Sequence, residues 1–278
     1  QPDAGGGGIY NAGGSLTITG STIAGNGAVQ GCGGGIYSNG GALNIVNSTI
    51  SGNQAERNGG GLYIYSTSLG GGLLGWATFP SNYVTTPTAP GGGEGGAFGG
   101  GGGGTILLKA TILGPSSPAN CSGIVSTSQG FNVATDSTCG LTLSSDVQGI
   151  APMLAALEDN GGPVRTHALL PGSPAIDRVP APGCRDILTS SPLVTDGRYF
   201  LRPVDGDGDL LADCDTGAYE LSATAIPAGS VPDGSGIGGV PLQVEMAGCD
   251  IRLNWGTSCR DTDTDYEVYR GTLGTYYS

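Results

Sequence analysis

Apolar residues in the first part of the chain occur in short alternating bursts that recur at a fixed distance. Each burst is bounded by Gly, Asn or Ser, which is typical of strands separated by tight turns. One such repeat is too short to bury its own apolar face, so repeats must stack with parallel strands about 4.8 Å apart. The pattern predicts an all-β fold, a right-handed parallel β-helix. The recurring apolar positions are Ile9, Leu16, Ile18 and Ile23, and then Ile36, Leu43, Ile45 and Ile50.

Two motifs, Gly-Gly-Ile-Tyr and Ser-Thr-Ile-x-Gly-Asn, define this repeat. A third copy opens at Gly61-Leu62-Tyr63, and the motif returns after a Gly-rich insert at Gly96-Ala97-Phe98. These motifs resemble the repeats of polymorphic outer-membrane-type β-helix proteins over roughly residues 5–113. We therefore expect residues 1–113 to be β-helix repeats interrupted by a Gly-rich insert.

Residues 114–222 carry a different set of motifs. They are Asn160-Gly-Gly-Pro163, Ser173-Pro-Ala-Ile-Asp177, Arg202-Pro-Val-Asp205-Gly-Asp207 and Cys214-Asp-Thr-Gly-Ala-Tyr-Glu220. This region resembles the C-terminal part of bacterial choice-of-anchor Q domain proteins, which are secreted β-helix proteins. The resemblance implies that the region caps the β-helix and that two disulfides join Cys121 to Cys139 and Cys184 to Cys214. It leaves Cys32, Cys249 and Cys259 unassigned, with a local Cys249–Cys259 bridge and intermolecular bridges both open.

The end of the chain is expected to be a separate module. Residues 223–239 are rich in Gly, Ser and Pro and are typical of a linker. Residues 240–278 then give three alternating strand signals, at Leu242–Val244, Ile251–Trp255 and Tyr266–Tyr269. They resemble the start of a fibronectin type III-like sandwich, of which about half is present.

Composition and charge exclude several classes of protein. Glycine supplies 56 of 278 residues without a Gly-X-Y period, which excludes collagen. A net charge of −13 argues against a nucleic-acid partner, because phosphate binding needs clustered Lys and Arg. Seven cysteines without a CxxC pair favour disulfides and hence a secreted, extracellular or cell-surface location. No apolar run is long enough to span a membrane.

Two ends of the predicted architecture look open. Three strands of a sandwich leave an unpaired edge, and the first repeat lacks the polar cap that stops solenoids from stacking. We therefore hypothesise that the chain polymerises with itself, either head to tail or by strand addition. The expected assembly residues are Ile9, Tyr10, Leu253, Trp255, Tyr266 and Tyr269.

A non-catalytic extracellular role, as a surface or matrix filament subunit or an adhesin, fits this pattern. The alternative is a polysaccharide-binding or polysaccharide-degrading β-helix protein, whose partner would be a cell-surface polysaccharide. Such enzymes need clustered carboxylates on the β-helix wall, and this wall has almost no ionisable groups. The only histidine, His167, lies in a stretch that we interpret as structural, because no Gly-x-Ser-x-Gly elbow supports a catalytic triad.

One acidic cluster is a candidate calcium site. Alternating carboxylates on a turning backbone resemble the first half of calcium loops, but Thr216 stands where a bidentate glutamate is expected. A solvated acidic turn therefore stays open as the other interpretation. The candidate ligands are Asp205, Asp207, Asp209, Asp213 and Asp215.

Three further features of the repeat region have two interpretations each. Asn26 and Asn53 recur at one point of the repeat, where they can stack as an internal amide ladder. The recurring tyrosines are either packed or form an aromatic stripe that contacts sugars or a partner. Asn47-Ser-Thr49 and Asn120-Cys-Ser122 match the N-glycosylation pattern, which the sequence leaves undecided. The tyrosines are Tyr10, Tyr37 and Tyr63.

Overall fold

The computed structural model describes residues 6–65, 71–86, 94–101 and 103–221, together with the backbone of two strands near the C-terminus. The chain divides into two compact units, residues 1–223 and 224–278. Within the described residues the only helical segment is a 3-10 turn at Ala181–Gly183, so the all-β prediction is confirmed. No helix in these residues has the length and apolar character that crossing a membrane requires.

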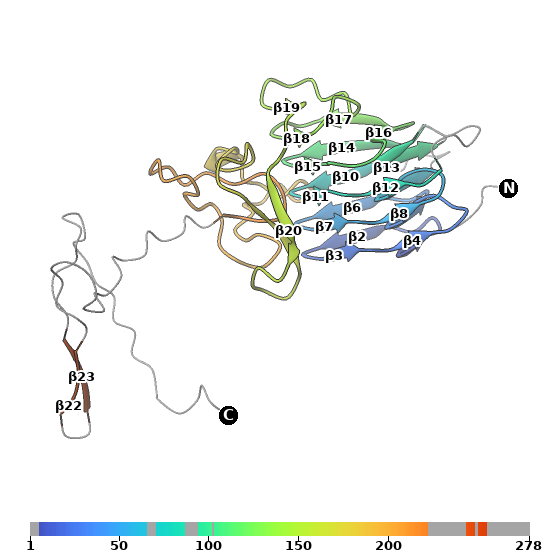
Figure 1. The fold of residues 1–278 in the computed structure, drawn as a ribbon. Helices are drawn as coiled ribbons and strands as arrows, with labels where there is room; N and C mark the ends of the chain where they lie inside the picture. The colour runs from blue at the N-terminus through green and yellow to red at the C-terminus, as the bar shows by residue number, and fades with distance from the viewer. Residues whose placement is uncertain are drawn as a thin grey trace. The chain divides into compact units, whose positions relative to one another are not determined.

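Parallel sheets make up the first unit (Figure 1). Sheet A contains β1 (Ile9–Asn11), β5 (Ile36–Asn39), β9 (Leu62–Tyr65), β13 (Gly95–Gly101) and β16 (Ala119–Ser122). Sheet B contains β2 (Leu16–Thr19), β6 (Leu43–Val46), β10 (Gly72–Gly75), β14 (Thr105–Lys109) and β17 (Val125–Ser128). Sheet C contains β3 (Thr22–Ala24), β7 (Thr49–Ser51), β11 (Thr78–Phe79), β15 (Ile112–Leu113), β18 (Val133–Ala134) and β19 (Val147–Gln148). Sheet D contains β4 (Gly27–Ala28), β8 (Gln54–Ala55) and β12 (Tyr83–Val84).

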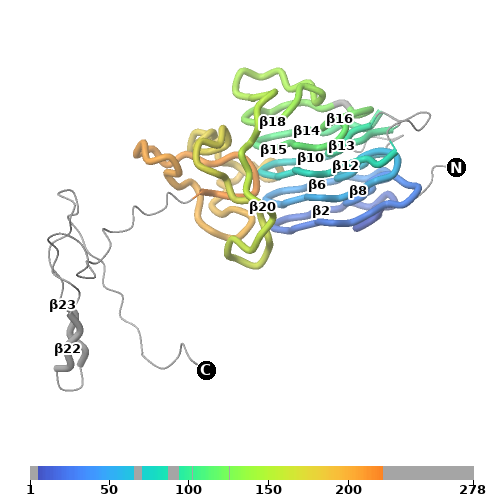
Figure 2. Tube along the Cα trace, in the orientation of Figure 1, coloured from blue at the N-terminus to red at the C-terminus, as the bar shows by residue number. Residues whose placement is uncertain are grey.

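The chain visits these sheets in turn and then returns to sheet A, as the trace in Figure 2 shows. We call each passage a coil, so that coils 1 to 5 begin at β1, β5, β9, β13 and β16. Equivalent repeat positions pair across coils: Ile9 with Ile36, Leu16 with Leu43, and Ile23 with Ile50. The predicted stacking of parallel strands is therefore confirmed, in the register that the repeat indicates.

The core lies between the sheets and is apolar. Aliphatic side chains from coil 2 onwards are almost fully buried, and Phe79 packs edge-on against Phe98 with 4.6 Å between ring centroids. Close approach of the coils also limits side-chain size between them. A Cβ atom added to Gly34 would overlap the carbonyl oxygens of Gln54 and Gly60, which explains the glycine of the Gly-Gly-Ile-Tyr motif.

An amide ladder runs through the first three coils. Asn53 Oδ1 accepts hydrogen bonds from both the backbone N and the Nδ2 of Asn26, each at 3.0 Å. Asn82 Oδ1 accepts the same pair of bonds from Asn53, and Asn53 Nδ2 also donates to the Ile23 carbonyl. Asn53 and Asn82 are 0% exposed, so the amide side chains satisfy backbone groups that water does not reach. The ladder predicted from Asn26 and Asn53 is present and extends to Asn82.

The two ends of the coil stack differ. Residues 135–146, which we call the end loop, fold over coil 5 and are joined to it by the Cys121–Cys139 disulfide. Polar side chains of this loop accept hydrogen bonds from backbone N–H groups of coil 5: Asp136 from Asn120, Thr138 from Cys121, Ser145 from Phe131, and Asp146 from Asn132. Coil 1 has no such cover among the described residues. A head-to-tail polymer needs both ends open, so the end loop argues against that mode of assembly.

Residues 149–221 lie along the side of the stack, not over its end (Figure 1). Strands β20 (Leu154–Glu158) and β21 (Thr166–Leu169) form an antiparallel hairpin in this region. Leu169 and Ala175 pack against Ile112 and Val133 on the outer face of sheet C. The resemblance implied a cap from the whole of residues 114–222, whereas among the described residues the end loop and β19 lie over coil 5 and residues 149–221 pack on its side.

In the second unit, β22 (Gln243–Ala247) and β23 (Asp250–Asn254) form an antiparallel pair in which Val244 lies opposite Leu253. These strands correspond to the first two strand signals of the expected sandwich. The third signal, with Tyr266 and Tyr269, lies outside the described residues, as do Trp255, Cys249 and Cys259.

Candidate functional site

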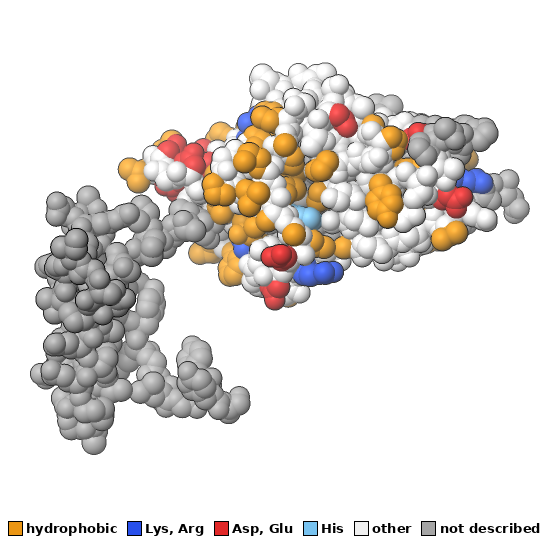
Figure 3. All heavy atoms as spheres, in the orientation of Figure 1, with side chains coloured by type: hydrophobic (Ala, Val, Ile, Leu, Met, Phe, Trp, Pro, Cys, Tyr) orange, Lys and Arg blue, Asp and Glu red, His pale blue; other side chains and the backbone are white. Residues whose placement is uncertain are grey.

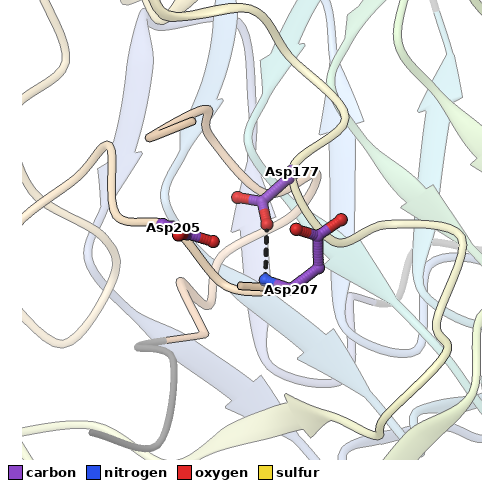
Figure 4. Close-up of side chains that lie close together, drawn as sticks. All are labelled: Asp177, Asp205 and Asp207. Carbon is purple, nitrogen blue, oxygen red and sulfur yellow. Dashed lines mark hydrogen bonds between the residues drawn. The ribbon is translucent and has the colours of Figure 1, made fainter. Parts of the chain in front are cut away.

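Three carboxylates meet beside the acidic loop. One oxygen of each of Asp177, Asp205 and Asp207 lies within 4.8 Å of the others (Figure 4). Asp177 Oδ2 accepts hydrogen bonds from the backbone N of Gly206 at 2.8 Å and of Asp207 at 2.7 Å. This carboxylate therefore holds the loop that carries the other two.

The Asp177 side chain has a second, unused oxygen. Its Oδ1 is buried and has no hydrogen-bond partner. Burial is the largest influence on this carboxyl and raises its pKa to about 6, against the lowering effect of the two N–H donors. A buried oxygen without a partner is suited to a hard cation such as calcium, so the three carboxylates fit the predicted ion.

The structure places the predicted ligands in three different surroundings. Asp205 and Asp207 belong to the carboxylate group, whereas exposed Asp209 accepts a turn hydrogen bond from Leu211 N. Asp213 accepts from Ala181 N, and Asp215 is fully buried elsewhere. The structure thus brings two of the five predicted ligands together and leaves the last three outside this group, and metal binding by any of them stays a prediction. The sequence prediction did not include Asp177, whose only signal is its place at the end of the Ser-Pro-Ala-Ile-Asp motif.

Calcium binding at this group stays a prediction with a measurable effect. At about 10 mM free calcium, a site in the weak extracellular range should raise the free energy of unfolding by roughly 1–3 kcal/mol. We expect Asp177→Asn to abolish this gain, measured by thermal melting with calcium and with a chelator. Asp209→Asn is the matched control and should retain it. Equal melting temperatures with and without calcium in the parent protein would contradict calcium binding at this group.

Buried charges form a second constellation, next to coil 3. Arg202 and Glu220 are 3% and 1% exposed and form an ion pair, with 3.2 Å between Nε and Oε2. The Arg202 guanidinium lies over the Trp76 ring at 4.7 Å and donates to the Gly217 carbonyl. Burial raises the pKa of Glu220, while Arg202 and the N–H groups of Asp215 and Val204 act in the opposite direction. The Arg-Pro and Gly-Ala-Tyr-Glu motifs thus meet in one structural contact.

A second buried pair extends this constellation. Arg198 binds Asp196 with 2.7 Å between Nη2 and Oδ2, and its guanidinium lies 3.7 Å from the Tyr219 ring centroid. Asp196 also accepts hydrogen bonds from the backbone N of Phe200 and of Glu220. The Arg198 nitrogens donate to Asp196 and to the carbonyls of Asn160 and Glu220, so we interpret this pair as holding the fold.

The same region binds the corner where each coil turns from sheet B to sheet C. We call residues 185–218, together with their corner contacts, the clamp. Asn47 Nδ2 donates to the Thr195 carbonyl, Trp76 Nε1 donates to the Arg185 carbonyl, and the Ala110 carbonyl accepts from Gly217 N. In coil 5 the Phe131 carbonyl accepts from Thr216 Oγ1, and in coil 1 Tyr199 Oη faces Gly20. The clamp therefore contacts all five coils, and a disulfide joins its Cys214 to Cys184, just before the clamp begins.

His167 fastens the β20–β21 hairpin to coil 2; its ring is the pale blue patch on the face shown in Figure 3. Its Nδ1 lies 2.7 Å from the Ala155 carbonyl, so this nitrogen donates, and its Nε2 accepts from the Ser51 hydroxyl at 2.8 Å. Both side chains are buried, at 8% and 5% exposed. The group that orients the ring is a backbone carbonyl, so the arrangement has no carboxylate member of a triad and fits the structural interpretation.

The His167 contact predicts a pH dependence. Burial lowers the pKa of His167 below its ordinary 6.5, so the folded protein favours the neutral ring. The stability from this contact is present above the ordinary pKa and is lost as the pH falls below it. We expect the difference in unfolding free energy between the parent and His167→Gln to shrink from about pH 7.5 to about pH 5 in urea titrations. A difference that stays constant over this range would contradict the assignment.

The recurring tyrosines are packed against one another. The ring centroids of Tyr10 and Tyr37 lie 5.2 Å apart, and those of Tyr37 and Tyr63 lie 5.3 Å apart. Tyr37 is only 3% exposed, and burial raises the pKa of both Tyr37 and Tyr63 to about 12. The ring faces are used in the stack, which leaves them unsuited to an aromatic stripe for sugars.

The two glycosylation motifs are not accessible in the folded chain. Asn47 is 8% exposed and bonded to the clamp, and Asn120 is 0% exposed and donates to Thr135 Oγ1. The structure thus argues against N-linked sugar at either position. The two disulfides of the described residues are those that the resemblance implied, Cys121–Cys139 and Cys184–Cys214.

Comparison with family models, with curated proteins and with solved structures gave no match to this chain.

Proposed function

We propose that this chain is a secreted, non-catalytic structural protein of the cell surface or extracellular matrix, built on a right-handed parallel β-helix of the choice-of-anchor Q type. One observation carries the proposal: the wall of the coils has almost no charged residues, and the buried charges beside it are paired within the fold. The wall of the coils, residues 6–134, has only Glu56, Arg57, Glu94 and Lys109 as charged residues. Beside the wall, Arg198 with Asp196 and Arg202 with Glu220 form buried ion pairs.

The proposed role is that of a rigid support, as in an adhesin. The end loop disfavours the filament with head-to-tail contacts, because its side chains occupy the backbone donors of coil 5. An extracellular location is supported by the two disulfides, since such bonds persist in oxidising compartments. The packing of residues 149–221 on sheet C also removes the covered part of that face from any surface on which a polysaccharide could bind.

The alternative, a polysaccharide-binding or polysaccharide-degrading protein, gives the sharpest test. We expect no release of reducing ends or unsaturated products from neutral and acidic polysaccharides, with and without calcium, and no retention in affinity electrophoresis. Product release that Asp205→Asn abolishes, and that Asp209→Asn leaves intact, would contradict the structural role. It would instead assign catalysis to the carboxylate group.

The location is tested separately. Fractionation of the producing cells should place the protein in the medium or on the surface. Labelling of unreduced, denatured protein with a thiol reagent should then leave Cys121, Cys139, Cys184 and Cys214 unmodified. Reactive thiols at these four positions would contradict an oxidising compartment.

A further inference from the structure

Coil 1 has the surface of an interior coil. Ile9, Leu16 and Ile23 pack against the core but stay partly exposed. Their counterparts in coil 2, Ile36, Leu43 and Ile50, are 0%, 1% and 0% exposed. The described chain thus leaves an apolar face uncovered at this end, bordered by backbone edges, because β1, β2, β3 and β4 are the outermost strands of their sheets.

The polar groups at this end follow the same repeat. In the amide ladder each Oδ1 accepts from the coil before it: Asn53 from Asn26, and Asn82 from Asn53. By the same rule, the donor that fits Asn26 Oδ1 is an asparagine at the same position of a coil stacked before coil 1. Tyr10 is at the end of the tyrosine stack and is 47% exposed, while the next ring inward is 3% exposed. The exposed aliphatic residues, the amide ladder and the tyrosine stack of coil 1 are therefore all complementary to the same kind of partner.

The other end of a second copy cannot be that partner. Coil 5 is closed by the end loop, which places Leu141 on the core and fills the backbone donors of Asn120 and Asn132. A parallel, in-register coil must therefore be presented by a segment that carries the repeat itself.

We propose that the exposed face of coil 1 docks one further parallel coil of the same repeat. Its chemistry is Gly-Gly-aliphatic-Tyr, then Leu-x-Ile, then Ser-Thr-Ile-x-Gly-Asn. The contact continues the interface that joins coils 1 and 2, where Ile9 pairs with Ile36 and Tyr10 with Tyr37. The inference deepens the proposed function and rests on it for the partner's role, since a rigid support is lengthened by added coils.

The test adds such a coil to the full chain. A copy of residues 33–58 is inserted directly before Gly6, which then stands where Gly59 follows Asn58. We expect the melting temperature to rise by about 4 °C or more, because the open apolar face is buried. Amide hydrogen exchange in β1 and β2 should also become slower. The matched control is the same insertion with its four core positions, Ile36, Leu43, Ile45 and Ile50, changed to Ser, and it should give no rise.

Two results would overturn the proposal. The first is an equal melting temperature for the extended chain and its serine control, or an extended chain that does not fold while the control does. The second is a parent protein that is a dimer by light scattering and becomes monomeric in Ile23→Lys, because a second copy then occupies the face. Neither result bears on the polysaccharide assays, so failure here is distinguishable from failure of the proposed function.

Discussion

Replacing Arg202 with Met is expected to lower the free energy of unfolding by about 3–5 kcal/mol, the largest effect of any single change that we consider. The substitution keeps much of the side-chain volume over Trp76 but leaves Glu220 without its counter-charge. Glu220 is 1% exposed and neighbours Asp215, which is also buried. An uncompensated carboxylate in this place is strongly unfavourable, and urea denaturation of both proteins at neutral pH measures the loss.

The pH dependence of the Arg202→Met variant distinguishes a charge effect from a packing effect. Without Arg202, the pKa of Glu220 should rise further. As the pH falls through that pKa, Glu220 becomes protonated, and the unfavourable free energy of its buried charge is removed. The variant should therefore regain stability between about pH 8 and pH 5 relative to the parent. Adding Glu220→Gln to the Arg202→Met variant removes the unpaired charge and should recover most of the loss at neutral pH. A single variant within about 1 kcal/mol of the parent would show that the pair does not hold the clamp.

The second large effect is expected in the amide ladder. Asn53→Ala removes the acceptor of the Asn26 N–H and the donor to both the Ile23 carbonyl and Asn82 Oδ1. Each polar group that is left buried without a partner costs about 1–3 kcal/mol, so we expect a total loss near 3 kcal/mol. The midpoint of urea unfolding, at an unchanged slope, measures it.

Asn26→Ala is the matched control for this prediction. It removes the same chemical group one coil earlier, where the side chain is partly exposed and water replaces the lost bonds. We expect its effect to be about 1 kcal/mol or less. Equal losses at the two positions would mean that burial does not govern the strength of the ladder.

The part of this fold that the sequence predicted is the part whose contacts recur at a constant spacing. Ile9, Ile36 and their equivalents fall at the same point of each repeat, so parallel stacking fixes which residues meet. The amide ladder follows from the same spacing, since Asn26 and Asn53 occupy one repeat position.

The clamp could not be predicted in this way because its partners are far apart in the chain and do not repeat. Trp76 meets Arg202, and Asn47 meets Thr195, through tertiary contacts that leave no local pattern. Charge is equally uninformative about burial in this region. Asp205 and Asp215 look alike in an alternating acidic run, yet one lies in the carboxylate group and the other is 0% exposed.

The clamp has a consequence for how such a protein can change its length over evolutionary time. Solenoids usually gain and lose whole repeats, because each repeat touches only its neighbours. Here the segment from Arg185 to Gly217 contacts one corner of each of five coils, from Gly20 to Phe131. A duplication inside this span would move the later coils one step along and separate them from their contacts. Duplications ahead of coil 1 leave every contact in place, so that end is where the lineage is free to grow.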